Sequence, residues 1–445
     1  MTVATAMPTP QRGTLDRLLA PFVDAREGEA GTALLLMLNV FLLLTCYYIL
    51  KPVREALILS SAGGAEAKSY ASAVMVVLLI FFVPAYSSFA SRVSRIRLIT
   101  GVTMFFIACL VGFYLLAQVK VPYLGIAFFV WMGIFNVAII AQFWSFANDV
   151  YTEEQGKRLF AIIAFGSTLG AILGSSVAKV LIQPVGVYQL MLVTAVLLGV
   201  SILITRAVDQ RERDRAPRAA AEPTPDTGDG FRLVMRDRYL LGIALLMLVL
   251  NFVNTNGEYI LGRTLSSIAE ANVRAGLNGA TPASDYKQTL IGSYYAGFLT
   301  WVNVVTAIVQ LFVVSRFLKW FGVRKALFVM PLISLGGYAI MAVMPVLSII
   351  RAVKIAENST DYSLQNTTRQ TLFLPTSREA KYKAKAAIDT FFFRSGDVLS
   401  AGLVFVGSMI ALAPKAFAAI NVVLVIAWLV IAVWIGREHK KLTQT

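Results

Sequence analysis

The chain has few of the residue types on which enzymes most often depend. Its 445 residues include one histidine, His439, and two cysteines, Cys46 and Cys109. Both cysteines fall inside long apolar runs, where a free thiol behaves as a small hydrophobic group, so neither a disulfide framework nor a metal site is expected. The sequence also lacks a P-loop, a dinucleotide-binding fingerprint and a nucleophile elbow. We therefore expect no enzymatic activity, no cofactor and no bound metal.

The beginning of the chain lacks the features of a secretory signal peptide. Its first 30 residues contain Asp16, Asp24, Glu27 and Glu29, with no apolar core and no small-residue cleavage site. Since a signal peptide needs both of these features, we do not expect one here.

Long apolar runs are the main feature of the sequence. Hydrophobic residues make up 57% of the chain, which is too much for a soluble domain whose surface must stay polar. About 20 apolar residues cross a bilayer, and windows of that length predict about twelve spanning helices. The predicted spans lie near residues 32–50, 70–91, 98–119, 122–147, 159–182, 186–205, 239–262, 290–315, 323–344, 346–373, 386–412 and 415–436. The sequence thus predicts an all-α, polytopic membrane protein.

The net charge of +15 has a topological explanation. Basic residues gather in alternate loops, for example at 92–97, 206–238, 316–325 and 378–385. The positive-inside rule assigns such loops to the cytoplasm. We therefore expect both termini in the cytoplasm of a bacterial cell, with the chain in the inner membrane, and no nucleic-acid partner.

A charged, proline-rich stretch at residues 209–230 has no apolar periodicity and predicts a flexible linker. Six predicted spans precede it and six follow, a layout that resembles transporters of the major-facilitator type. The expected segments are a cytoplasmic N-terminal segment at 1–31, a six-helix bundle at 32–206, a cytoplasmic linker at 207–238, a second six-helix bundle at 239–436 and a cytoplasmic tail at 437–445.

Span five contains Gly166, Gly170 and Gly174 at intervals of four residues. Small residues at this spacing let two helix backbones approach closely. We expect tight packing within the bundle, and a sliding helix face is the functional alternative.

Several charged residues fall at membrane depth in spans ten and eleven. A charge near the bilayer centre costs about 2.5–3.5 kcal/mol on insertion scales, so it needs a partner or a wet cavity. Two interpretations remain open: ion pairs that fix the bundle, or basic groups that bind an anionic substrate. The residues concerned are Glu357, Asp361, Arg369, Asp389, Arg394 and Asp397.

Other polar residues interrupt the first, fourth and seventh spans. Lys51, Arg54 and Glu55 follow span one, and because the apolar run continues beyond them we expect an extended helix with inward charges; snorkelling to the interface is the alternative. Span four contains polar Asn136 and ends at Asp149, which we expect to form a gate or a loop cluster with Lys157 and Arg158.

Span seven ends in a run of asparagines that precedes Gly257 and Glu258. A glycine can unwind a helix where it lines a cavity, which would make Glu258 an intramembrane carboxylate. A position near the outer surface is the rival interpretation.

Three passages carry a family resemblance: YYILKPVREALIL at 47–59, FWSFANDVYTEEQGKRLF at 143–160, and the stretch 361–401. Together they resemble the ATP/ADP translocase family of plastids and intracellular bacteria. That resemblance implies exchange of nucleotides, typically ATP for ADP, with dependence on intramembrane lysines and glutamates. The family's two lysines fall on Arg54 and Arg369, and its second-half glutamate falls on Glu258. Its fourth-span glutamate falls near Met132, where this chain has no acid.

We therefore expect a secondary transporter that moves a nucleotide or a related phosphorylated anion by alternating access, through exchange or proton coupling. It would be a monomer in the lipid bilayer. The alternatives are a non-transporting interaction or sensing protein and a carrier of a non-nucleotide anion. The expected substrate-binding residues are Arg54, Asn136, Glu258, Asp361, Arg369 and Arg394. The expected gating or ion-pair residues are Lys51, Glu55, Asp149, Glu357, Asp389 and Asp397.

Overall fold

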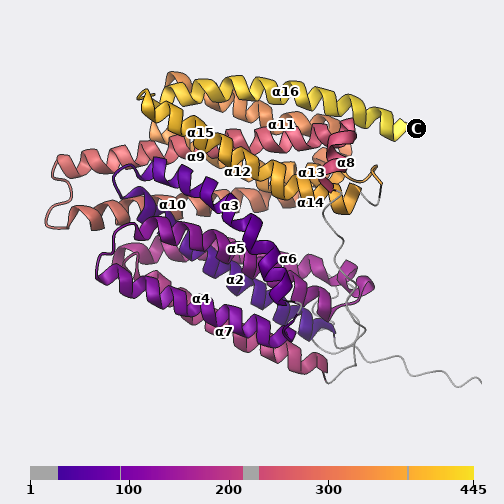
Figure 1. Ribbon diagram of the computed structural model, residues 1–445, viewed down its shortest axis with the longest axis horizontal. Coiled ribbons are helices and arrows are strands. Elements are labelled where there is room, and N and C mark those ends of the chain that lie inside the picture. The colour runs from indigo at the N-terminus through magenta and orange to yellow at the C-terminus, as the bar shows by residue number, and fades with distance from the viewer. Residues whose placement is uncertain (1–28, 91, 214–229, 378–379, 445) are drawn as a thin grey trace, which may run out of the picture.

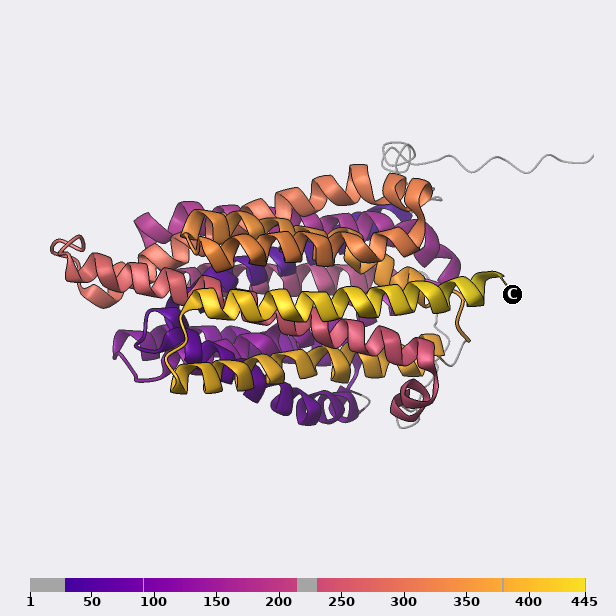
Figure 2. The same ribbon diagram turned by 90° about the horizontal axis from the view of Figure 1, so that it is seen from above.

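The computed structural model describes residues 29–90, 92–213, 230–377 and 380–444, and every regular element in these ranges is a helix. The helices lie along the long axis of an elongated bundle, with the first half of the chain on one side and the second half on the other (Figure 1). We call the end that carries the α9–α10 connection, residues 275–282, the hairpin end. The opposite end, where α16 finishes, is the C-terminal end. The α9–α10 hairpin projects beyond the other helices (Figure 2).

The first half contains six long helices. They are α2 (Glu29–Leu59), α3 (Gly64–Ala90), α4 (Arg95–Gln118), α5 (Leu124–Val150), α6 (Glu153–Val185) and α7 (Gln189–Arg213).

The second half is more broken, because four π-helical segments, each with a wider turn than an α-helix, interrupt it. Its elements are α8 (Gly230–Arg236), α9 (Arg238–Arg274), α10 (Ala283–Ile308), η1 (Val309–Val314), α11 (Ser315–Val343), α12 (Leu347–Thr360), η2 (Asp361–Gln365), α13 (Asn366–Leu372), η3 (Ala380–Ala384), α14 (Lys385–Ala387), η4 (Ile388–Phe392), α15 (Phe393–Met409) and α16 (Pro414–Gln444).

The prediction of about twelve spans is confirmed. Ten helical runs among the described residues are long and apolar enough to cross a membrane. One of them, 283–343, contains two crossings, because Gly322 adopts a left-handed φ of 73° and Ala326 beyond it packs back against Val314. The tenth crossing, α12–η2–α13, is not among the ten because its charged residues lower its hydropathy.

The expected linker differs in part from the structure. Helix α7 continues to Arg213 and α8 begins at Gly230, so both ends of the range 207–238 are helical. The middle of that range, 214–229, and residues 1–28 of the N-terminal segment lie outside the described residues.

The glycines of span five confirm the packing interpretation. A Cβ atom at Gly166, Gly170 or Gly174 would come closer than 3.0 Å to a main-chain carbonyl of α2. The three carbonyls belong to Met37, Phe41 and Thr45, one helical turn apart. Helices α2 and α6 therefore touch through their backbones over two turns, which only glycine permits.

Each half has a large apolar cluster of its own, and six helices make contacts between the halves. Helix α10 of the second half packs against α2 and α6, while α3 of the first half packs against α9 and α15. Figure 1 shows α3 and α10 at the border between the two halves. Side chains on these six helices are therefore the ones positioned to connect the halves.

Candidate functional site

A chain of ion pairs begins on α2, near the hairpin end. Helix α2 continues unbroken past Lys51 to Leu59, as expected, so Arg54 and Glu55 lie within the helix. The Nε atom of Arg54 donates to Oε1 of Glu55 at 3.0 Å, and its guanidinium lies 4.7 Å from the ring centre of Phe129 on α5. The other carboxylate oxygen of Glu55 lies 2.7 Å from Nζ of Lys68 on α3. Glu55 is thus held between two cations and is only 2% exposed.

This series of ion pairs crosses from one half of the molecule to the other at Glu258 of α9. One oxygen of Glu258 lies 3.8 Å from Nζ of Lys68, and the other lies 3.5 Å from Nζ of Lys354 on α12. Asn358 also donates to Glu258 at 3.2 Å. The side chain of Glu258 is 23% exposed, more than its partners, so water reaches the crossing point.

The series of ion pairs ends in a fully buried pair within the second half. Nζ of Lys354 lies 2.7 Å from Oε2 of Glu357, and both side chains are 0% exposed. Lys354 also donates to Oδ1 of Asn254 at 2.6 Å. Glu357 accepts hydrogen bonds from Ser334 at 2.9 Å and from Tyr338 at 2.9 Å, both on α11. Every charge in this pair is compensated, which burial demands.

A second cluster joins the halves nearer to the hairpin end. The guanidinium of Arg263 on α9 donates to Glu66 of α3 at 2.8 Å, and the Tyr259 hydroxyl donates to the same oxygen at 2.9 Å. One turn further along α9, Ser266 donates to the main-chain oxygen of Leu59 at 2.9 Å. These contacts close the two halves against each other at the hairpin end.

At the C-terminal end, Arg95 and Arg158 form ion pairs within the first half. Arg95 of α4 bridges Asp149 at 3.4 Å and Asp209 at 2.8 Å. Arg158 binds Glu29 of α2 at 2.9 Å, so the expected cluster of Asp149 with Arg158 is wrong. Nearness in sequence suggested that cluster, but α6 turns Arg158 toward α2. The side chain of Lys157 lies outside the described residues.

Lys51, Arg351 and Arg369 have no carboxylate partner within 4.0 Å among the described residues; the guanidinium of Arg351 lies 5.3 Å from the ring centre of Tyr294 on α10. The Lys51 amine lies 5.3 Å from the ring centre of Tyr48 on its own helix and 6.0 Å from that of Tyr362 on η2. Tyr362 is 40% exposed although it lies in the middle of span ten. The guanidinium of Arg369 donates to Oδ1 of Asn366 at 3.0 Å, and its Nε atom is buried without a hydrogen bond.

The charged residues of span eleven form a separate cluster between α15 and α9. Arg394 pairs with Asp397 at 3.6 Å, the spacing expected from sequence. Asp397 also accepts hydrogen bonds from Asn251 at 3.0 Å and Thr255 at 2.7 Å. Because both donors lie on α9, this cluster fastens α15 to α9 inside the second half.

The remaining expected residues lie outside the series of ion pairs. Asp361 begins η2, next to Tyr362, and is half-buried. Asp389 is half-buried on η4, and its Oδ1 atom has no hydrogen-bond partner in the described structure. Asn136 on α5 likewise has a buried Oδ1 atom without a partner. The structure therefore brings Glu258 and Glu357 into one chain with Arg54 and Glu55 but does not bring Asn136 or Arg394 into it.

The expectation that Gly257 unwinds span seven is wrong. Helix α9 runs unbroken from Arg238 to Arg274. A Cβ atom at Gly257 would instead come closer than 3.0 Å to the Tyr338 hydroxyl and lie 3.1 Å from Nζ of Lys354. The glycine thus lets the buried pair approach the α9 backbone.

Sequence reasoning missed Lys68, Ser334 and Tyr338. Lys68 lies in the second turn of α3, where a lysine ordinarily marks the membrane interface, and Tyr338 lies in an apolar run. The available signal for Lys68 was its place between a glycine pair, Gly63 and Gly64, and a long apolar run; the other two residues had none.

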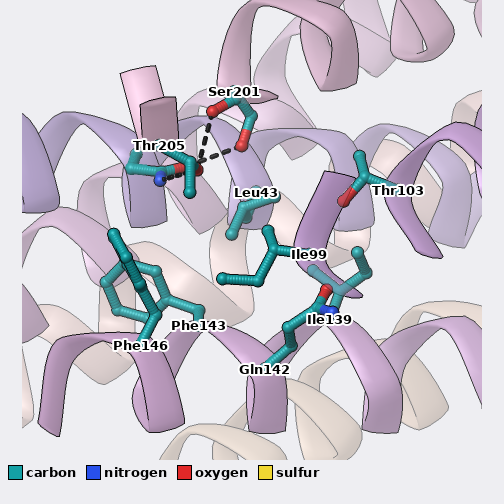
Figure 3. Close-up of a pocket in the computed structure, with 10 residues that line it drawn as sticks. Leu43, Ile99, Thr103, Ile139, Gln142, Phe143, Phe146, Ser201 and Thr205 are labelled. Atoms are coloured by element: carbon teal, nitrogen blue, oxygen red, sulfur yellow. Dashed lines mark hydrogen bonds between the residues drawn. The ribbon is translucent and has the colours of Figure 1, made fainter. Parts of the chain in front are cut away.

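A small cavity within the first half lies apart from these ion pairs. Leu43, Thr103 and Gln142 line it, and Asn39 donates to Thr205 at 2.7 Å and accepts from Ser201 at 2.6 Å beside it (Figure 3). Its volume is about 20 Å³, which suits one water molecule. It is too small for an organic substrate.

Comparisons with known proteins support this description. Residues 36–356 match the family model described as Major Facilitator Superfamily. The chain is 24% identical to ADP,ATP carrier protein 1 of Chlamydia muridarum, with 90% of this chain and 88% of that protein covered. It is 24% identical to ADP,ATP carrier protein 4 of Rickettsia bellii, with 69% and 65% covered. The resemblance expected from the three sequence passages is confirmed.

Solved structures show the same fold at low identity. A crystal structure of a mutant of the nucleoside transporter NupG gives a TM-score of 0.65 at 13% identity and covers 90% of this chain and 99% of that one. A bacterial homologue of the iron transporter ferroportin, in an inward-facing state, gives a TM-score of 0.61 at 13% identity, with 91% and 98% covered. The predicted arrangement of two six-helix halves agrees with these neighbours.

Proposed function

The chain belongs to the Major Facilitator Superfamily, and from that premise we propose that it is a secondary transporter that carries a nucleotide or a related phosphorylated anion by alternating access. The substrate class is supported by the extended similarity to proteins named ADP,ATP carriers. The observation that carries the proposal is that Lys51, beside Tyr362 of span ten, and Arg369, further along that span, have no carboxylate within 4.0 Å among the described residues. A buried or half-buried charge without a partner is costly, and an anionic substrate would offset that cost.

Lys51 and Arg369 are proposed to hold the charged groups of the substrate. Lys51 lies beside Tyr362, and Arg369 is seven residues further along the same span. Seven residues extend about 10 Å along a helix, so the two cations are spread along the interface as an elongated anion would require. Arg369 offers the planar fork that suits phosphate oxygens, while Lys51 acts as a point charge.

Arg54 takes a different role in this proposal from the one expected. It is paired with Glu55 in this conformation, so it belongs to the ion-pair chain rather than to a preformed substrate site. Together with Glu55 and Glu258 it forms part of a gate: a substrate anion that draws Arg54 away would leave Glu55 to Lys68 alone.

Movement between states would require the halves to separate at the hairpin end. The contacts to be broken there are Lys68–Glu258 and Glu66–Arg263. Once they open, Glu258 keeps Lys354 and Asn358 as partners, and Lys68 keeps Glu55. Glu66 and Arg263 lose each other on opening, but both side chains are partly exposed, so water can solvate them and the cost is small.

Uptake of labelled ATP and ADP into proteoliposomes tests the proposal. We expect Lys51→Ala and Arg369→Ala each to lower uptake about 10-fold or more, since a hydrogen bond to a charged group contributes about 1.5–3 kcal/mol. Arg274→Ala, at the exposed end of α9, is the matched control and should transport normally. Uptake that is unchanged in both variants would remove the assignment of these two cations.

One observation favours a second candidate, a non-transporting interaction protein. Six charged residues from Arg54 to Glu357 saturate one another in this conformation, as they would in a bundle held permanently closed. That candidate predicts no nucleotide uptake by the wild-type protein, together with no change of its melting temperature when nucleotides are added.

A further inference from the structure

We infer that a basic pocket between α11 and α16 at the C-terminal end binds the headgroup of an anionic phospholipid. The pocket encloses about 500 Å³ and is lined by Arg324 and Lys325 of α11 and by Arg437 of α16. We call it the α11–α16 pocket. Neither Lys51 nor Arg369 lines it, so the inference does not depend on the proposed transport function.

The charge of the α11–α16 pocket has one sign. Three cations and a histidine are among its lining residues, and none of those residues is acidic. The acid nearest in sequence, Glu438, is engaged by Lys441 at 2.7 Å. Arg324, Lys325 and Arg437 are all exposed. Three convergent cations with no carboxylate among them form a site for phosphate oxygens.

The backbone shapes the pocket. Gly322 also lines it, and its positive φ breaks the helical run so that the chain folds back toward α16. This turn places Arg324 and Lys325 directly opposite the last turns of α16, where Arg437 lies. Nothing would contact a Cβ atom built at Gly322, so the glycine is required by its conformation and not by crowding.

The surroundings of the pocket fit a lipid better than a free anion. Trp320 and Phe321 precede the turn and are 70% and 46% exposed, as aromatic residues at a membrane surface commonly are. On α16, the exposed Ile426, Val430 and Val433 follow one another at helical spacing and lead to Arg437 on the same face. A headgroup in the pocket would therefore have an apolar stripe beneath it along which its acyl chains could lie.

The position in the fold supports the same conclusion. Figure 1 shows α11 and α16 together at the outer edge of the second half, remote from the first half. Basic pockets between spanning helices at the membrane surface are typical sites for anionic headgroups. A transported substrate, by contrast, must bind between the halves.

Native mass spectrometry of the full-length protein in detergent tests the inference, with dioleoyl phosphatidylglycerol, dioleoyl phosphatidylcholine and inorganic phosphate as probes. We expect retention of phosphatidylglycerol in preference to phosphatidylcholine. The triple variant Arg324→Gln, Lys325→Gln, Arg437→Gln should bind phosphatidylglycerol about 100-fold less tightly, since each basic residue near an anionic surface contributes about fivefold.

The matched control is Arg316→Gln with Lys319→Gln, which removes two exposed cations at the same end of α11 that do not line the pocket. It should retain the lipid as the wild type does. If the triple variant elutes as aggregate, Arg437→Gln alone is measured, with a loss of about fivefold expected. Equal retention of the two lipids, equal retention by the triple variant, or binding of phosphate as tight as that of phosphatidylglycerol would each overturn the inference.

Discussion

Lys68 of α3 and Glu258 of α9 connect the two halves of the molecule across 3.8 Å, the longest contact in a chain of otherwise shorter ion pairs. On either side of this contact the charges are held at 2.7–3.5 Å. The ion pairs are therefore short within each half, and the one that joins the halves is longer. A link of this kind is suited to being broken and formed again.

Glu258→Gln tests this link. The substitution keeps the shape and the hydrogen bond with Asn358 but removes the charge that attracts Lys68 and Lys354. We expect the exchange rate to fall about 10-fold, since a hydrogen bond to a charged group contributes about 1.5–3 kcal/mol, and the melting temperature to change little because both lysines keep another acid. Glu270→Gln on the same helix is the control. Normal exchange by Glu258→Gln would show that the link has no part in transport.

Lys354 and Glu357 are expected to be energetically coupled. Lys354→Met leaves the fully buried Glu357 carboxylate without its cation, which we expect to destabilise the protein by about 3–5 kcal/mol. The double variant Lys354→Met, Glu357→Leu removes both charges and should be more stable than Lys354→Met. Chemical unfolding of the single and double variants measures the coupling, and simple additivity of the two losses would contradict it.

Gly257→Ala should destabilise the second half by about 1–3 kcal/mol, because the added methyl group overlaps the Tyr338 hydroxyl. Removing that hydroxyl relieves part of the overlap, so Gly257→Ala should cost less in a Tyr338→Phe background than in the wild type. Gly199→Ala on α7, where the methyl group meets no atom within 4 Å, serves as control. Thermal unfolding of the wild type, Gly257→Ala, Tyr338→Phe and the double variant measures these costs. An equal cost of Gly257→Ala in both backgrounds would rule out the proposed overlap.

The contact between Glu66 and Arg263 should tolerate exchange of its two charges. Glu66→Arg alone places two cations together at the hairpin end, and Arg263→Glu alone places two acids together. Each single variant should lose about 1 kcal/mol or less of stability, because both side chains are partly exposed, and should transport more slowly. The double swap should recover most of the transport rate. Failure of the double swap to improve on either single variant would argue against a direct role of the pair in closure.

The spans were predictable because hydropathy accumulates over about 20 residues and does not depend on neighbours. Even span ten was expected despite its charges, and the extension of α2 beyond Lys51 followed from the apolar run to Leu59. Ion-pair partners were not predictable in the same way. Arg158 pairs with Glu29, 129 positions away, and Lys68 reaches Glu258 only because α3 packs on α9. Such partners depend on how helices distant in sequence come together, which a local pattern does not contain.

Gly257 shows a second limit. A glycine beside asparagines in a membrane helix suggested a local change of the backbone, yet α9 is regular there. The reason for the glycine is Tyr338, a residue far along the chain on α11, and no property of the segment around Gly257 carries that information. Lys51 and Arg369, in contrast, could be singled out from the sequence as charges next to or within apolar runs, but that neither has a carboxylate within 4.0 Å among the described residues is visible only in three dimensions.

The backbone contact between α2 and α6 limits how the first half can rearrange. Three carbonyls of α2, one helical turn apart, lie against Gly166, Gly170 and Gly174, so neither helix can rotate about its axis without a collision. The two helices must therefore tilt together as a single rigid pair. Helix α6 also packs on α10 of the second half. Any tilt of α6 against α10 therefore moves the charged end of α2 as well. A motion at the boundary of the halves thus displaces Arg54 and Glu55.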